Sequence, residues 1–192
     1  DRRLLSTASV ALTSSTLNFA SDGGAIGIST QNLASLTYSG GNTINIGRDG
    51  ATAGSRADLI LGSLTRSTNP AARGTLQLRQ LDAQAATLGT ATATSRVLVT
   101  TSAPAPTNGM VGANIVLWGG ANMQDSNQPL FVTYDGTNGF QAATFGLVPT
   151  NAATLQAATA GQIVDFNNIT GTTTMTSNAT MQAFRLRTPA NT

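Results

Sequence analysis

The stretch LTSSTLNF, at residues 12–19, opens a phrase that is written three times between residues 12 and 82. The first half of the phrase reads Leu-Thr-x-Ser and begins at Leu12, Leu36 and Leu64. The second half reads Thr-apolar-polar-apolar and begins at Thr16, Thr43 and Thr75. Both halves alternate apolar and polar residues, which is the period of a strand that is buried on one face.

A unit this short cannot bury its own apolar face, so it must stack on its neighbours. Strands that stack at a period of twenty to thirty residues are typical of a β-solenoid. The spacer between the two halves grows from nothing in the first copy to Gly40–Asn42 in the second and Thr68–Gly74 in the third. Insertions at one point of a repeat indicate a loop on one face of the stack.

The composition favours strands and turns and excludes several kinds of chemistry. All ten basic residues are Arg and all eight acidic residues are Asp, and the chain contains no His and no Cys. Without these residues there is no ordinary catalytic triad, no thiolate nucleophile and no His or Cys ligand set for zinc. No Arg cluster with interleaved aromatic residues indicates nucleic-acid binding. No apolar run approaches the ~18 residues of a membrane helix, so membrane insertion is not expected.

We predict an all-β fold, a parallel β-helix (β-solenoid) with an irregular, aromatic-containing side structure. Residues 1–101 are expected to form solenoid rungs, and residues 151–192 are expected to return to rungs. Between them, residues 102–150 carry most of the aromatic side chains and read as an elaborated loop and β insertion that packs on the solenoid. The best helix candidate, residues 151–160, is rich in Ala but short.

Several segments in order resemble the large secreted bacterial proteins built of autotransporter-associated β-strand repeats. The segments that carry this resemblance are Ala57–Ser67, Gly74–Leu78, Thr107–Gly112 with Trp118–Gly120, Phe131–Ala142, and Val164–Phe166 leading to Thr180–Leu186. The resemblance covers most of the chain from Thr16 onward. It implies export to the bacterial surface, a parallel β-helix and an adhesive or structural role, and it brings no catalytic residues.

Isolated carboxylates are the only candidates for metal binding or acid–base catalysis. Asp22, Asp49 and Asp135 each precede Gly and could contribute to calcium sites, but such sites need dense acidic ligands at short spacing. Capping of their own turns is therefore the favoured role. A polysaccharide-cleaving groove would need acidic side chains to converge, and the candidates for it are Asp58, Asp82 and Asp165. We predict no catalytic residue, no metal and no cofactor.

Threonine and aromatic side chains suggest two kinds of surface. Alternating Thr90, Thr92 and Thr94, and the run Thr172–Thr174, invite an ice-binding interpretation, but these pairs do not recur rung after rung. Trp118 and Tyr134 could stack on sugar rings, and the alternative is that they form the core of the loop region.

The two ends of the predicted solenoid are the candidate self-association surface. Solenoids that stay monomeric cover their end rungs with charged or bulky caps, and no cap is evident here. The exposed rung residues at these ends are expected to be Leu4, Leu5, Met181, Phe184 and Leu186. We predict an extracellular or cell-surface structural protein that stacks on itself in a filament or a giant repeat array. The alternatives are an adhesin or carbohydrate-binding module that contacts surface glycans, and a polysaccharide-acting β-helix enzyme.

Overall fold

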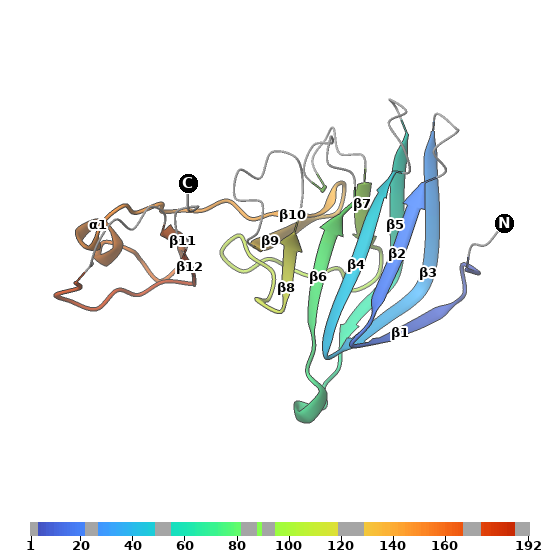
Figure 1. The fold of residues 1–192 in the computed structure, drawn as a ribbon, viewed down its shortest axis with the longest axis horizontal. Helices are drawn as coiled ribbons and strands as arrows, with labels where there is room; N and C mark the ends of the chain where they lie inside the picture. Colours follow the sequence, from blue (N-terminus) through green and yellow to red (C-terminus); the bar gives the residue numbers. More distant parts are fainter. Residues whose placement is uncertain are drawn as a thin grey trace.

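The computed structural model describes residues 4–21, 27–48, 55–81, 88–89, 95–118, 129–166 and 174–186. These residues form an all-β structure, as the sequence predicts, in three sheets (Figure 1). The strands are β1 Ser9–Thr13, β2 Thr16–Ser21, β3 Ile28–Ser39, β4 Gly41–Arg48, β5 Arg56–Arg66, β6 Thr75–Gln80, β7 Ser95–Val99, β8 Ile115–Trp118, β9 Leu130–Asp135, β10 Gly139–Ala142, β11 Ile163–Phe166 and β12 Ala183–Leu186. A short 3-10 helix η1 spans Pro70–Ala72, and one helix, α1, spans Ala152–Gln156.

Successive strands from β1 to β8 alternate between two sheets. The odd-numbered strands form a four-stranded sheet in the order β1-β3-β5-β7. The even-numbered strands β2, β4, β6 and β8 lie side by side in a second sheet, which ends with β9 and β10. All pairs from β1 to β8 are parallel, whereas β9 pairs antiparallel with β8 and with β10. The second sheet is therefore mixed, with its parallel part between β2 and β8.

Parallel register places the apolar residues of successive strands in columns that run through the core. One column joins Leu17, Ile44, Leu78 and Leu117 across the second sheet. The last three of these side chains are fully buried. Because the strands alternate inward and outward, β2 and β6 each contribute two apolar residues to such columns, and the polar Ser21 and Gln80 follow them on the buried side.

The repeated phrase is in register at some strand pairs and shifted by two residues at others. Thr16 pairs with Thr43, so the first two copies of the second half align. Thr75 pairs instead with Gly41, which moves the third copy by two positions. An even shift keeps each side chain on its original face, so the apolar columns are preserved.

The spacers of the phrase form the corners between the two sheets. The first corner is a tight turn in which Ser14 donates its N–H to the carbonyl of Ser39. The second turns at Gly40, whose φ of 70° is a left-handed conformation that favours glycine. Asn42 lies buried beside it and donates to the Gly40 carbonyl while accepting from the Ser15 N–H. The third corner is enlarged by η1, which Asn69 caps.

The two longest strands, β3 and β5, bend at Ala34 and Gly62. Along β3, the buried side chains lie two residues apart up to Leu33, but the next buried side chain is Leu36, three residues further on. A Cβ atom at Gly62 would lie 2.2 Å from the carbonyl oxygen of Ala34, so only glycine allows this close approach.

Beyond the parallel stack, the antiparallel hairpin β9–β10 packs against the core and a small unit follows it. Tyr134 and Phe140 of the hairpin meet edge to face, with ring centroids 5.0 Å apart. The unit contains α1 and the parallel pair β11–β12, and Leu147 forms an additional parallel bridge to Val164. It lies at the opposite end of the long axis from the N-terminus (Figure 1). Within the described residues, no helix is long and apolar enough to cross a membrane.

Candidate functional site

The N-terminal side of the stack ends in two strand edges, β1 in one sheet and β2 in the other. Ala8 uses its carbonyl to accept from Ala34 on the β3 side, and the pleat then directs the backbone groups of alternate residues to either side. Ser9, Ala11 and Thr13 therefore direct their N–H and C=O groups toward the open edge. Unpaired groups of this kind can be completed by another strand.

The apolar columns lose their cover at this edge. Leu17 begins a column whose other members are fully buried, yet it is only half-buried itself, and Val10 and Phe19 are half-buried in the same way. Leu4 and Leu5, which the sequence assigns to self-association, are 48% and 77% exposed. The first rung is thus an incompletely covered end of the core.

Gln31 partly closes the same end. Its buried side chain donates to the carbonyl of Leu4 at 3.0 Å and accepts from the Leu4 N–H at 3.2 Å. The carboxamide therefore satisfies both backbone polar groups of Leu4, as a residue of a neighbouring strand would. This contact fixes Leu4 over the first part of β3 and leaves the edges of β1 and β2 uncovered.

The second open edge belongs to β12. Phe184 and Leu186 pair with Val164 and Phe166, which are buried in the core of the C-terminal unit. Their own side chains are 43% and 49% exposed. Met181 is half-buried and packs against the same cluster.

The far end of the eight-stranded stack is covered, which the sequence did not predict. The hairpin β9–β10 pairs with β8, so β8 is not an edge and the second sheet ends in β10. The sequence-predicted association residues therefore fall into two groups, Leu4 and Leu5 before β1, and Met181, Phe184 and Leu186 just before and within β12, and these two elements lie far apart (Figure 1).

Asp58 is clamped between two arginines on the outside of the first sheet. Arg56 binds both carboxylate oxygens at 2.9 and 3.0 Å, and Arg96 on the next strand binds them at 3.2 and 2.7 Å. Arg96 also donates to the carbonyl of Thr137 at 3.0 Å. The hydrogen bonds that Arg96 donates to Asp58 raise the pKa of the Arg96 guanidinium. This carboxylate joins β5, β7 and the hairpin.

Asp165 is held in a similar pair in the C-terminal unit. Arg185, its register partner on β12, binds the two carboxylate oxygens at 2.8 and 2.7 Å. The same guanidinium lies 4.7 Å from the ring centre of Phe145. Asp58 and Asp165 thus belong to different sheets, and Asp82, the third candidate for a catalytic groove, lies outside the described residues.

Asp135 caps the turn between β9 and β10. Its Oδ1 accepts from the N–H groups of Thr137 at 2.8 Å and Asn138 at 2.7 Å, and its Oδ2 accepts from the Gln141 side chain. The Asn138 N–H is the main reason that the pKa of Asp135 lies below its ordinary value. Asp22 and Asp49 are outside the described residues. In the part of the chain that is described, no group of three acidic side chains could hold a metal ion.

The two aromatic residues singled out from the sequence lie in different environments. Tyr134 is only 8% exposed, and its hydroxyl donates to the carbonyl of Val99 and accepts from the Val99 N–H, each at 2.9 Å. Its place is inside the core. Trp118 is half-buried on the outer face of β8, where register aligns it with Arg79, Asn45 and Asn18. No sequence pattern indicates this alignment, because it depends on the lengths of the connections between strands.

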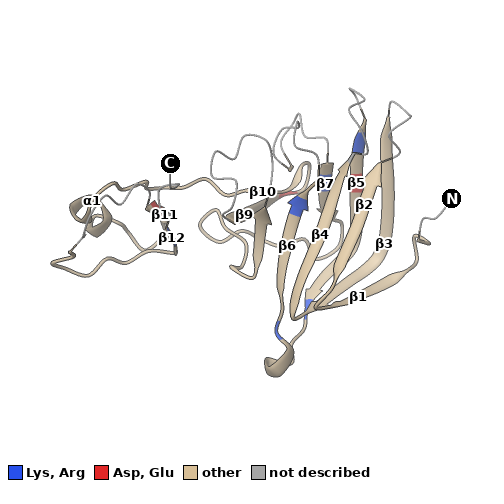
Figure 2. Cartoon of the chain, viewed as in Figure 1, with Lys and Arg blue, Asp and Glu red and all other residues tan. Residues whose placement is uncertain are grey.

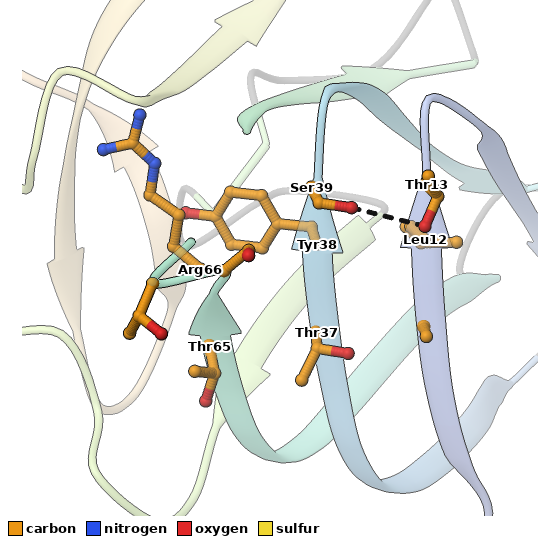
Figure 3. A pocket seen from close by; sticks show the side chains of 10 residues that line it. Leu12, Thr13, Thr37, Tyr38, Ser39, Thr65 and Arg66 are labelled. Carbon is orange, nitrogen blue, oxygen red and sulfur yellow. Dashed lines mark hydrogen bonds between the residues drawn. The ribbon is translucent and has the colours of Figure 1, made fainter. Parts of the chain in front are cut away.

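A hydroxyl-lined hollow of about 350 Å³ crosses the outer face of β1, β3 and β5 near their corners (Figure 3). Thr37 and Thr65 pair in register across it, and Ser39 donates to Thr13 at 3.3 Å. The buried Tyr38 lies below, and burial raises the pKa of its hydroxyl. These hydroxyls recur from strand to strand, whereas Thr90, Thr92 and Thr94 lie outside the described residues.

A scan against protein-family models, a search of curated proteins and a search of solved structures each found no match to this chain.

Proposed function

We propose that this chain is an extracellular structural protein, a β-solenoid whose open edges accept strands from other copies. The solenoid interpretation is supported by strands that alternate between two sheets and pair in parallel from β1 to β8. It is also supported by the bend at Ala34 and Gly62, which divides each long strand between two sides of a coil. The location outside the cell rests on the resemblance to surface-exported repeat proteins.

The assembly proposal rests on one observation: the buried columns of apolar residues end in partly exposed residues at two separate strand edges. Leu17 at one edge and Leu186 at the other each extend a buried column to a strand that has no further partner strand among the described residues. Pairing these edges would bury apolar surface, which would stabilise the contact by roughly 25 cal/mol per Å² of buried apolar area. It would also satisfy the backbone groups of both edges.

The two edges differ, so the contact between copies is heterologous. The β12 edge of one copy faces the β1 and β2 edges of the next, and a contact between unlike surfaces propagates unless its rotation closes a ring. The product is a filament or an extended array. The roles of Asp58 and Asp165 support this over polysaccharide cleavage, because each carboxylate is already held by arginine.

Assembly is tested by electron microscopy and sedimentation velocity on the purified chain over a wide range of concentration. We expect fibres, or oligomers that grow with concentration. The variant Ala11→Pro removes an N–H that faces the open edge while leaving the bonds to β3, so it should suppress growth. Phe184→Ser removes apolar surface from the other edge and should have the same effect.

The matched control for the edge variant is Ala11→Val, which changes the side chain at the same position but keeps the N–H. Circular dichroism establishes that both variants fold. If the unmodified chain stays monomeric at millimolar concentration, or if Ala11→Val blocks growth as strongly as Ala11→Pro, strand addition at this edge is wrong.

A further inference from the structure

A row of four polar and aromatic side chains crosses the outer face of the second sheet. We call it the outer row and define it as Asn18, Asn45, Arg79 and Trp118, one residue from each of β2, β4, β6 and β8. Its members come from positions spread over a hundred residues of sequence. Because strands are about 4.8 Å apart, the row is about 14 Å long.

The outer row combines the side chains that recognise sugar polymers. Trp118 offers an indole face, which packs against the apolar face of a pyranose ring. Asn18 offers an exposed amide group, and Asn45 orients it, because Asn45 Nδ2 donates to Asn18 Oδ1 at 2.7 Å while Asn45 Oδ1 is itself buried. The parallel row beside it adds Thr43 and Gln77, whose side chains lie 3.4 Å apart. A ligand that runs across the strands would meet a donor or acceptor at each rung.

The charge of this face selects among sugar polymers. The four strands β2, β4, β6 and β8 contain no acidic residue, and Arg79 places a positive charge in the outer row. Arg79 is exposed, and within the described residues it has no ion pair or hydrogen bond from its guanidinium. By contrast, Asp58, Asp165 and Asp135 accept hydrogen bonds from other groups, near strand ends and in the hairpin turn (Figure 2). The face is therefore complementary to an anion.

We propose that the outer row binds a polysaccharide that carries uronic acid carboxylates. Arg79 forms a two-pronged ion pair with one carboxylate, which is the geometry that guanidinium groups favour. The sugar ring beside that carboxylate stacks on Trp118, and a neighbouring sugar along the polymer bonds to the exposed amide of Asn18. The site lies on the face of the sheet, so its occupation does not require the open edges.

The protein contains a single tryptophan, so the proposal has a direct readout. Trp118 emission is followed while a short oligogalacturonide is added, using the Ala11→Pro variant so that edge pairing does not contribute. We expect a saturable change in emission that weakens as salt is raised, since the ion pair is partly exposed. Arg79→Gln should weaken binding at least about tenfold, because it removes the charged partner of the carboxylate.

The matched control is Arg73→Gln, which removes the same charge from an exposed position on the corner loop before β6. It should leave the affinity within about twofold, a change of well under 1 kcal/mol. Trp118→Phe, followed by calorimetry, should retain weaker binding, and Trp118→Ala should lose it. An oligogalacturonide with methyl-esterified carboxyls should bind at least about tenfold more weakly than the acid.

Three results would overturn the proposal. The first is an unchanged emission and no heat at high oligogalacturonide concentration. The second is an equal loss of affinity in Arg73→Gln and Arg79→Gln, which would mean that overall charge alone attracts the polymer. The third is equal binding of the esterified and the acidic oligosaccharide, which would remove the role of the carboxylate.

Discussion

The parallel stack and the C-terminal unit are built from the same kind of strand, yet they bury their residues to very different extents. In the stack, Leu78 sits in a column of four and is completely buried. In the unit, Leu186 sits in a column of two with Phe166 and remains half exposed. Both regions also use one carboxylate–arginine pair between adjacent strands. The difference shows that depth of stacking, rather than strand composition, determines how much core each region has.

The largest expected effect on stability comes from shortening a side chain in the middle of a buried apolar column. Leu78→Ala should lower the free energy of unfolding by about 2–5 kcal/mol, because it removes a fully buried side chain and leaves a cavity. Leu17→Ala, in the same column at the open edge, should cost less than half as much. Urea unfolding followed by circular dichroism measures both variants, and equal losses would contradict the role of stacking depth.

The next largest effect is expected from removing the ion pair between Asp165 of β11 and Arg185 of β12. Asp165→Asn should destabilise the C-terminal unit by about 3 kcal/mol, since it leaves the Arg185 guanidinium, only 11% exposed, without its anionic partner. Hydrogen exchange of the β11 amides reports on this unit separately from the stack. The double variant Asp165→Leu/Arg185→Leu should recover much of the loss. If the double variant is as unstable as the single one, an unpaired charge is not the cause.

The hairpin that covers the stack should be weakened by a smaller change. Tyr134→Phe removes both hydrogen bonds to the backbone of Val99 and keeps the ring contact with Phe140. We expect a loss of about 1–3 kcal/mol, because a buried backbone group is left unsatisfied. Thr133→Ala on the outer side of β9 is the control and should change stability by less than about 0.5 kcal/mol. Comparable losses in the two variants would refute this account.

The smallest effect is a pH dependence located in the same hairpin. The pKa of Asp135 is lower in the folded state, mainly because of the Asn138 N–H, so the ionised carboxylate stabilises the turn. This contribution is complete above the unfolded pKa of about 4 and is lost as the pH falls through the folded pKa. Asp135→Asn should therefore be less stable at neutral pH, and the two proteins should converge in acid. A difference that stays constant down to acid pH would exclude the carboxylate charge as the source.

The sequence predicted the strands well because the pattern that defines them is local. Strands β2 and β6 begin at Thr16 and Thr75, where two copies of the second half of the phrase begin. The register shift at Thr75 is even, so Leu76 and Leu78 are buried as the alternating pattern predicts, although the third copy does not align with the second.

The features that the sequence did not predict depend on which strands become neighbours. Asp58 and Arg96 are brought together by a loop whose length sets the register of β5 and β7. The alignment of Arg79 with Trp118 also depends on strand register, so the sequence pattern does not reveal it. The bend at Gly62 could have been suspected, because a glycine inside a strand often marks a close approach of backbones.

The register shift by two residues has a consequence for how such a chain can change over generations. An insertion or deletion of two residues at a corner displaces one strand along its neighbour, yet every inward side chain stays inward. Lineages can therefore lose a recognisable repeat length while the stack itself persists. In this molecule the corner between β5 and β6, which is enlarged by η1, directly precedes the strand that carries the two-residue shift.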